Sequence, residues 1–134
     1  MPDFTDIVGQ DSALGQLQQI AAGERRPHAY IFAGPTGVGR RTTALALGRL
    51  LLCEEPAGRA NQAGLWGLAK SFRIRQGCSA CQSCRMLRAD THPDLHIVHR
   101  QLARYHEDQG VRSRVMQELG IDVIRQFLIA PAYR

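Results

Sequence analysis

Four cysteines are the residues of this sequence whose type and spacing point most directly to chemistry. Cys78, Cys81 and Cys84 follow the spacing C-x-x-C-x-x-C, and 24 residues separate the first of them from Cys53. Four soft sulfur ligands suit a tetrahedral zinc ion, and a shell closed by four protein ligands leaves no position for a reacting water. The pattern therefore predicts a structural zinc site formed by Cys53, Cys78, Cys81 and Cys84.

Other uses of the same thiols are compatible with the pattern. Buried free cysteines, a redox pair of the C-x-x-C type, and a site in which His92 or His96 replaces one cysteine all stay open. The three-cysteine knuckle also lies in a basic stretch without any acid, residues 70–88, whose charged residues are Lys70, Arg73, Arg75, Arg85 and Arg88. Because four thiolates around zinc carry a net charge of about −2, we expect these cations to balance the metal site rather than to contact nucleic acid.

A glycine-rich loop is the second chemical signal. In the phosphate-binding motif G-x-x-x-x-G-K-[ST], backbone N–H groups and a helix N-terminus surround phosphate oxygens, the lysine reaches the β and γ phosphates, and the hydroxyl binds magnesium. Here Arg40 and Arg41 occupy the lysine and hydroxyl positions, and Thr42 lies about 100° further round the helix. Because arginine has no oxygen to bind a cation, the sequence predicts a loop that does not hydrolyse ATP.

Three uses of this loop stay open: weak binding of ATP or ADP, some retained ATPase activity, and a turn that merely joins a strand to a helix. The candidate nucleotide-binding residues of the loop are Gly34, Pro35, Thr36, Gly37, Val38, Gly39, Arg40, Arg41 and Thr42.

The elements before the loop follow from hydrophobic spacing. Residues 12–22 predict an amphipathic helix with Ser12 or Asp11 as its N-cap and Gly23 as its stop. Residues 29–33 form a short apolar and aromatic run, which predicts a buried strand.

The elements predicted after the loop continue the alternation of helices and strands. A helix is predicted over 42–52, an exposed insertion loop over 54–77 with a helical turn within 65–72, and a strand over 94–99. A last helix is expected to begin with Asp122 as N-cap and to end at Pro131. Alternating helices and strands predict an α/β fold with a parallel sheet and flanking helices.

The composition fits one globular domain. The chain has 134 residues, of which 44% are hydrophobic and 22% charged, and its formal net charge is +5. Of the 17 basic residues, Lys70 is the only lysine. There is no apolar run of the roughly 20 residues that span a membrane, and the first residues are acidic where a signal peptide is basic, so we expect a cytoplasmic protein without membrane contact.

Four blocks of sequence together resemble the bacterial DNA polymerase III clamp-loader subunits, a branch of the AAA+ family. They are Phe4–Gln10, Pro27–Pro35, Leu51–Cys53 with the three-cysteine knuckle, and Thr91–Asp94. The resemblance implies a RecA-like AAA+ module over 1–134, a zinc-binding insertion at 54–90 within it, and an adenine pocket lined by Ile7 and Val8. The degenerate loop resembles that of the delta-prime type, whereas gamma and tau subunits keep the lysine and the threonine.

The resemblance implies a function without catalysis by this chain. A delta-prime-like subunit joins gamma/tau and delta subunits in a ring that opens the sliding clamp and loads it onto primed DNA during replication, within a holoenzyme that is a DNA-directed DNA polymerase. A clamp-loader ATPase of gamma/tau type and a stand-alone zinc module that binds nucleic acid are the alternatives. In the family, the helix resembling 121–128 precedes the Walker B strand, sensor one and a collar domain, so we expect the sequence to represent an incomplete module.

Overall fold

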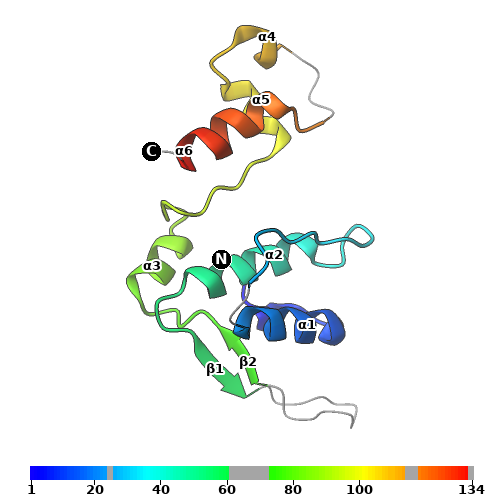
Figure 1. The fold of residues 1–134 in the computed structure, drawn as a ribbon, viewed down its shortest axis with the longest axis vertical. Helices are drawn as coiled ribbons and strands as arrows, with labels where there is room; N and C mark the ends of the chain where they lie inside the picture. Colours follow the sequence, from blue (N-terminus) through cyan, green and yellow to red (C-terminus); the bar gives the residue numbers. More distant parts are fainter. Residues whose placement is uncertain (24–25, 61–72, 114–117, 133–134) are drawn as a thin grey trace. The chain divides into compact units, whose positions relative to one another are not determined.

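The computed structural model describes residues 1–23, 26–60, 73–113 and 118–132, which form two compact units, 1–92 and 93–134 (Figure 1). The expected helical turn within 65–72 lies outside the described residues. No helix among the residues described has both the length and the apolar character needed to cross a membrane.

The first unit begins with a 3-10 turn at Phe4–Asp6 and the helix α1, Asp11–Ala22. Helix α1 confirms the predicted helix and its stop at Gly23. The predicted N-cap is wrong, because Gln10 is the capping residue and both Asp11 and Ser12 lie inside the first turn.

Helix α2, Arg40–Leu52, confirms the helix predicted over 42–52 and starts two residues earlier, directly after Gly39. Its buried face packs with Phe4 and α1 in one hydrophobic core, made up of Phe4, Leu14, Ala21, Ala46, Leu47 and Leu50. Because α2 begins at the glycine-rich loop and ends at Cys53, it connects the two candidate sites.

Within the described part of 54–77, where an exposed loop is expected after α2, the chain forms a two-stranded antiparallel sheet. Strand β1, Ala57–Ala60, pairs with β2, Arg73–Gln76, in a register that places Ala57 opposite Gln76 (Figure 1). Strand β2 is also joined to α1, since the buried Gln18 side chain accepts from the Arg75 N–H and donates to the Arg75 carbonyl, both at 2.9 Å. The amide thus pairs with the strand as a neighbouring backbone would.

The buried strand predicted over 29–33 is not present. Tyr30 and Phe32 pack against the core, but Ile31 between them is 93% exposed. A strand requires the backbone hydrogen bonds of a neighbour, and no backbone hydrogen bond of the described residues reaches 29–33. The side chains alternate as in a strand, while the ladder that defines one is missing.

The second unit consists of short helical elements around a small core of Ala103, Val111 and Val123. They are a 3-10 helix at Arg100–Tyr105, α4 at Gln109–Arg112, α5 at Ile121–Ile124, a π-helical segment at Arg125–Ile129 and α6 at Ala130–Ala132. The strand predicted over 94–99 is wrong, because no described backbone hydrogen bond reaches 94–98. The expected parallel sheet is therefore absent from the described part of the chain, whose one sheet is β1–β2.

The last helix corrects two further expectations. Its N-cap is Gly120, and Asp122 lies in the first turn, where its charge favours the helix N-terminus. Pro131 does not end the helix, which continues to Ala132 after the π-helical segment. Wider turns of this kind change the backbone hydrogen-bond partners, so a missing proline N–H can be accommodated there.

Candidate metal centre

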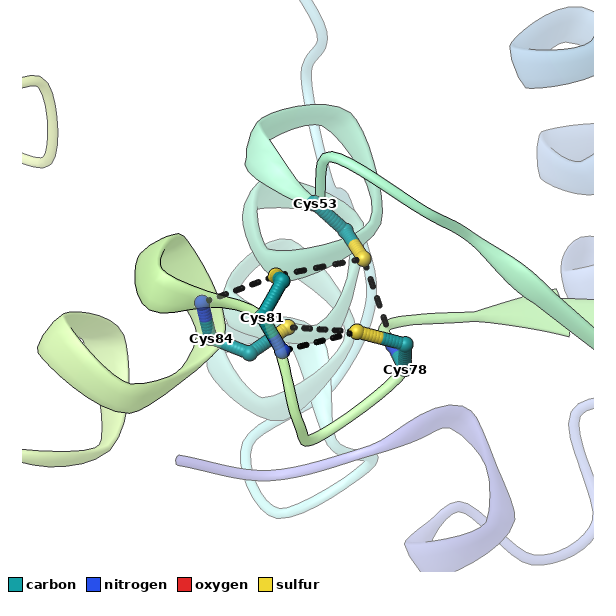
Figure 2. Close-up of side chains that lie close together, drawn as sticks. All are labelled: Cys53, Cys78, Cys81 and Cys84. Carbon is teal, nitrogen blue, oxygen red and sulfur yellow. Dashed lines mark hydrogen bonds between the residues drawn. The ribbon is translucent and has the colours of Figure 1, made fainter.

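Three elements of the first unit bring the four cysteines to one place. Cys53 is the C-cap of α2, Cys78 follows β2, and Cys81 and Cys84 flank the start of helix α3, Gln82–Arg88. The β1–β2 pairing reverses the chain between Cys53 and Cys78, so the 24 intervening residues do not hold them apart. Figure 2 shows the four side chains pointing toward a common centre.

The sulfur positions fit a tetrahedral metal ion. All four Sγ atoms lie within 4.8 Å of one another, with 3.9 Å between Cys53 and Cys81 and 4.0 Å between Cys78 and Cys84. Zinc–sulfur bonds of about 2.3 Å imply a tetrahedron edge of about 3.8 Å. The cysteines are free thiols rather than disulfides. This cluster can therefore bind a metal ion with little movement of its ligands.

Backbone N–H groups point at the sulfurs and favour their anionic form. The N–H of Cys78 donates to Cys53 Sγ at 3.2 Å, that of Cys81 to Cys78 Sγ at 3.2 Å, and that of Cys84 to Cys81 Sγ at 3.3 Å (Figure 2). The N–H of Ala80 adds a longer bond of 3.4 Å to Cys78 Sγ. Such donors stabilise negative charge on sulfur, which a metal site needs in all four ligands.

The thiols differ in how readily they ionise. The backbone N–H groups of Cys81 and Ala80 lower the pKa of Cys78 to about 6, so this residue is a thiolate at neutral pH. Burial raises the pKa of Cys53 to about 12 and also raises the pKa of Cys84. A metal ion must therefore displace protons from the two buried thiols when it binds.

Ser83 fixes the knuckle to the end of α2. Its buried hydroxyl donates to the Leu52 carbonyl at 2.6 Å and pairs with His92 Nε2 at 2.9 Å, while its N–H donates to Glu54 Oε1 at 3.1 Å. These bonds set the position of Cys84 relative to Cys53. The His92 ring thus pairs with a hydroxyl, and neither His92 nor His96 belongs to the group of ligand atoms found among the described residues.

The glycine-rich loop has left-handed glycines before α2, and arginines occupy the lysine and hydroxyl positions of the phosphate-binding motif. Gly37 and Gly39 have φ angles of 89° and 88°, which other residues rarely adopt, and α2 begins immediately after them. An open cavity of about 650 Å³ borders the loop, lined by Phe32, Gly37, Gly39, Arg40, Arg41, Thr42 and Ala44. Arg40 and Arg41 are both exposed, and the Thr43 hydroxyl donates to the Gly39 carbonyl at 2.9 Å.

The other loop residues and the adenine-pocket residues are less directly placed. Gly34, Pro35 and Thr36 form an exposed turn before Gly37, and Val38 lines a second cavity that also borders α1. Ile7 packs against the core, whereas Val8 is 90% exposed. Neither Ile7 nor Val8 lines the two cavities described beside the loop.

Comparisons with known proteins identify the class. A family model described as DNA polymerase III, delta subunit, matches residues 9–129. The chain belongs to this family, which confirms the resemblance seen in the sequence and supports a RecA-like module. No solved structure gives a significant match.

Curated relatives agree with the family. The chain is 32% identical over 95 residues to "DNA polymerase III subunit delta'" of Pseudomonas aeruginosa and 24% identical over 125 residues to the protein of that name from Escherichia coli K12. These matches cover 71% and 93% of the chain but only 24% and 26% of the relatives. "DNA polymerase III subunit tau" of Bacillus subtilis is 26% identical over 82 residues, or 61% of the chain and 12% of that protein. The chain thus spans about a quarter of the length of these delta-prime relatives.

Arg49, Gln18, Ser83 and helix α3 are features of the site that sequence reasoning missed. Arg49 and Gln18 occupy positions on the buried faces of α2 and α1, where polar residues are unusual. A polar residue at such a position signals a partner but does not tell which one.

Proposed function

We propose that this chain works as a non-hydrolysing clamp-loader subunit of delta-prime type, which helps to place the sliding clamp on primed DNA. Membership of the DNA polymerase III delta subunit family and the delta-prime relatives support this assignment. Other clamp-loader subunits, gamma/tau and delta, are the partners we propose, and they mediate contact with the clamp and with DNA. The tau and gamma/tau relatives support a complex built from similar modules.

The glycine-rich loop is the observation that carries this proposal. It has left-handed glycines at 37 and 39 beside an open cavity, and it presents Arg40 and Arg41 where hydrolysis requires a lysine and a magnesium-binding hydroxyl. We propose that residues 34–42, with Ile7 and Val8, bind ATP or ADP weakly at most and that the chain contributes surfaces to its partners.

We also propose zinc as the ion of the cysteine cluster, with Cys53, Cys78, Cys81 and Cys84 as its ligands. Four sulfur donors near tetrahedral spacing support zinc over harder divalent ions. Bound zinc supplies structural cross-linking and no reaction. It joins α2 to α3 in the insertion at 54–90 of the 1–134 module, and the cytoplasm keeps the thiols reduced for it.

ATP hydrolysis tests the assignment directly. The chain is mixed with the delta and gamma/tau subunits of its own organism, and association and DNA-stimulated hydrolysis are measured for the wild type and for Arg40→Ala. We expect the chain to join the complex, to hydrolyse no ATP alone, and to leave the hydrolysis rate of the complex unchanged when Arg40 is replaced.

Two other results would assign the chain to a different class. Hydrolysis by the isolated chain that disappears in Arg40→Ala indicates a gamma/tau-type ATPase. DNA binding by the isolated chain that weakens steeply with salt, without association with the other subunits, indicates a nucleic-acid-binding zinc module. For the metal, analysis of a freshly purified, reduced sample should give one zinc per chain.

A further inference from the structure

Arg49 is a cation buried beside the candidate metal centre. Its side chain extends from the buried face of α2, and the residue is 8% exposed. Burial of a guanidinium is costly unless charged and polar partners surround it. The partners of Arg49 lie in two different segments of the chain, the cysteine knuckle and the N-terminal turn.

On the metal side, Arg49 holds the turn that carries Cys78. Its Nη2 donates to the hydroxyl of Ser79, which has a positive φ of 67°. The Arg49 stem passes so close to Gly77 that a Cβ on this glycine would lie 2.8 Å from Arg49 Cγ and Nε and 3.2 Å from Cys84 Sγ.

On the opposite side, Arg49 binds the start of the chain. Its Nη1 lies 3.1 Å from Asp3 Oδ2. The other oxygen of that carboxylate accepts from the Phe4 N–H at 2.9 Å, and the Asp3 N–H donates to Asp6 Oδ2 at 2.7 Å. This capping box, formed by residues on both sides of Phe4, fixes the turn that carries Phe4, which is 1% exposed in the core of the unit.

We propose that Arg49 is a positioning residue that couples the metal centre to the N-terminal turn. One guanidinium group holds the Ser79 hydroxyl and the Asp3 carboxylate at once. Metal binding that fixes residues 77–79 thereby fixes Arg49 in the orientation that pairs with Asp3. Because such coupling is reciprocal, an ordered N-terminal turn strengthens metal binding in return.

The inference depends on the proposed metal site, and it assigns a role to a residue outside the ligand set. A buried ion pair without this role would stabilise the fold equally with and without metal. Coupling through Arg49 instead makes the order of residues 4–7 depend on metal, and this dependence disappears when either end of the link is removed.

Cobalt(II) titration of the chain, combined with amide hydrogen exchange of residues 4–7, tests the link. Cobalt in four-sulfur coordination has a visible absorption spectrum that reports ligand geometry. In the wild type we expect cobalt to slow exchange at 4–7. Arg49→Gln should weaken cobalt binding about 10-fold to 100-fold and abolish the effect of metal on exchange.

Asp3→Asn cuts the link at its far end and keeps the thiol environment intact. We expect this variant to keep the four-sulfur spectrum, to bind cobalt only a few-fold more weakly, and to show exchange at 4–7 that no longer responds to metal. Arg85→Gln is the matched control, since it removes the same charge next to Cys84 in sequence from an exposed position of α3. It should leave the response of exchange to metal intact and weaken cobalt binding by at most about twofold, which is the effect of one exposed cation on the charge balance of the site.

The outcomes separate the two proposals. If the wild-type chain binds no cobalt, the proposal of a metal site is itself overturned. A wild-type chain that binds cobalt, with exchange at 4–7 unaffected by the metal or with Asp3→Asn still showing the full response, overturns the role of Arg49 alone. If Arg49→Gln fails to fold, Asp3→Asn and Arg85→Gln still decide between these results.

Discussion

The cysteine cluster and the glycine-rich loop lie at opposite ends of α2, and the two regions differ in how many of the groups required for their chemistry they contain. The cluster has four sulfurs at metal-binding distances and N–H donors directed at them. The loop has the left-handed glycines of a phosphate site but arginines at both positions that carry the chemistry. The cluster thus contains the groups that metal binding needs, whereas the loop contains glycines typical of the phosphate-binding motif without the side chains that hydrolysis needs.

Removing one cysteine ligand tests the cysteine cluster, the region that contains the groups its chemistry requires. Cys81→Ser should weaken zinc or cobalt binding at least about 100-fold, because structural zinc binding of ~10–16 kcal/mol is shared among four ligands. Cobalt absorption measures the loss. Gln82→Ser, at the neighbouring exposed position, should bind like the wild type, and a Cys81→Ser chain of unchanged affinity would contradict a four-cysteine site.

The helix that joins the two regions offers the next largest effect. Leu47 is buried in the core midway along α2, so Leu47→Ala should lower the free energy of unfolding by about 3 kcal/mol. Urea unfolding followed by circular dichroism measures this change. Leu51→Ala, at an exposed position of the same helix, should cost less than about 1 kcal/mol. Equal losses would mean that α2 is not anchored by the face described here.

Acid should distinguish the thiols within the cluster. In the reduced, metal-free chain, the pKa of Cys78 is lowered to about 6, so its thiolate predominates at pH 7 and is lost as the pH falls. Alkylation of Cys78 by iodoacetamide should slow about tenfold between pH 7 and pH 5, following the thiolate fraction. Mass spectrometry locates the label. Cys53, whose pKa is raised to about 12, should react little at either pH, and early labelling of Cys53 would contradict the assignment.

The sequence predicted the parts of these two regions that depend on local pattern. Helices α1 and α2 follow from apolar spacing, and the cysteine spacing identified residues that the structure does bring together. The pairing of β1 with β2 could not be predicted from the local sequence, because Ala57 and Gln76 lie opposite each other only after the chain between them has reversed. The role of Arg49 could not be predicted from the local sequence either, since its partners Asp3 and Ser79 are 46 and 30 residues away from it along the chain.

The strands expected at 29–33 and 94–99 show that a local sequence pattern can also predict an element that does not form. Their side-chain patterns are those of strands, but a strand exists only when a neighbour supplies the hydrogen-bond ladder. Tyr30 and Phe32 still face the core, so the pattern correctly predicted which side chains of 29–33 turn inward. It did not predict the backbone pairing, which depends on other parts of a sheet.

Restoring the lysine and the hydroxyl of the phosphate-binding motif tests the glycine-rich loop and has the smallest expected effect. In Arg40→Lys combined with Arg41→Thr, the loop regains an ammonium for the β and γ phosphates and a hydroxyl for magnesium, while Gly37 and Gly39 keep the turn. We expect ATP affinity to rise roughly threefold to tenfold and to become magnesium-dependent, as one or two added polar contacts allow. Isothermal titration with and without magnesium measures both effects, and Arg41→Ala, which removes the charge without adding an oxygen, should gain no magnesium dependence. A restored loop that ignores magnesium would show that its backbone has departed from a phosphate site as well, and the contrast with the cysteine cluster would then extend from side chains to geometry.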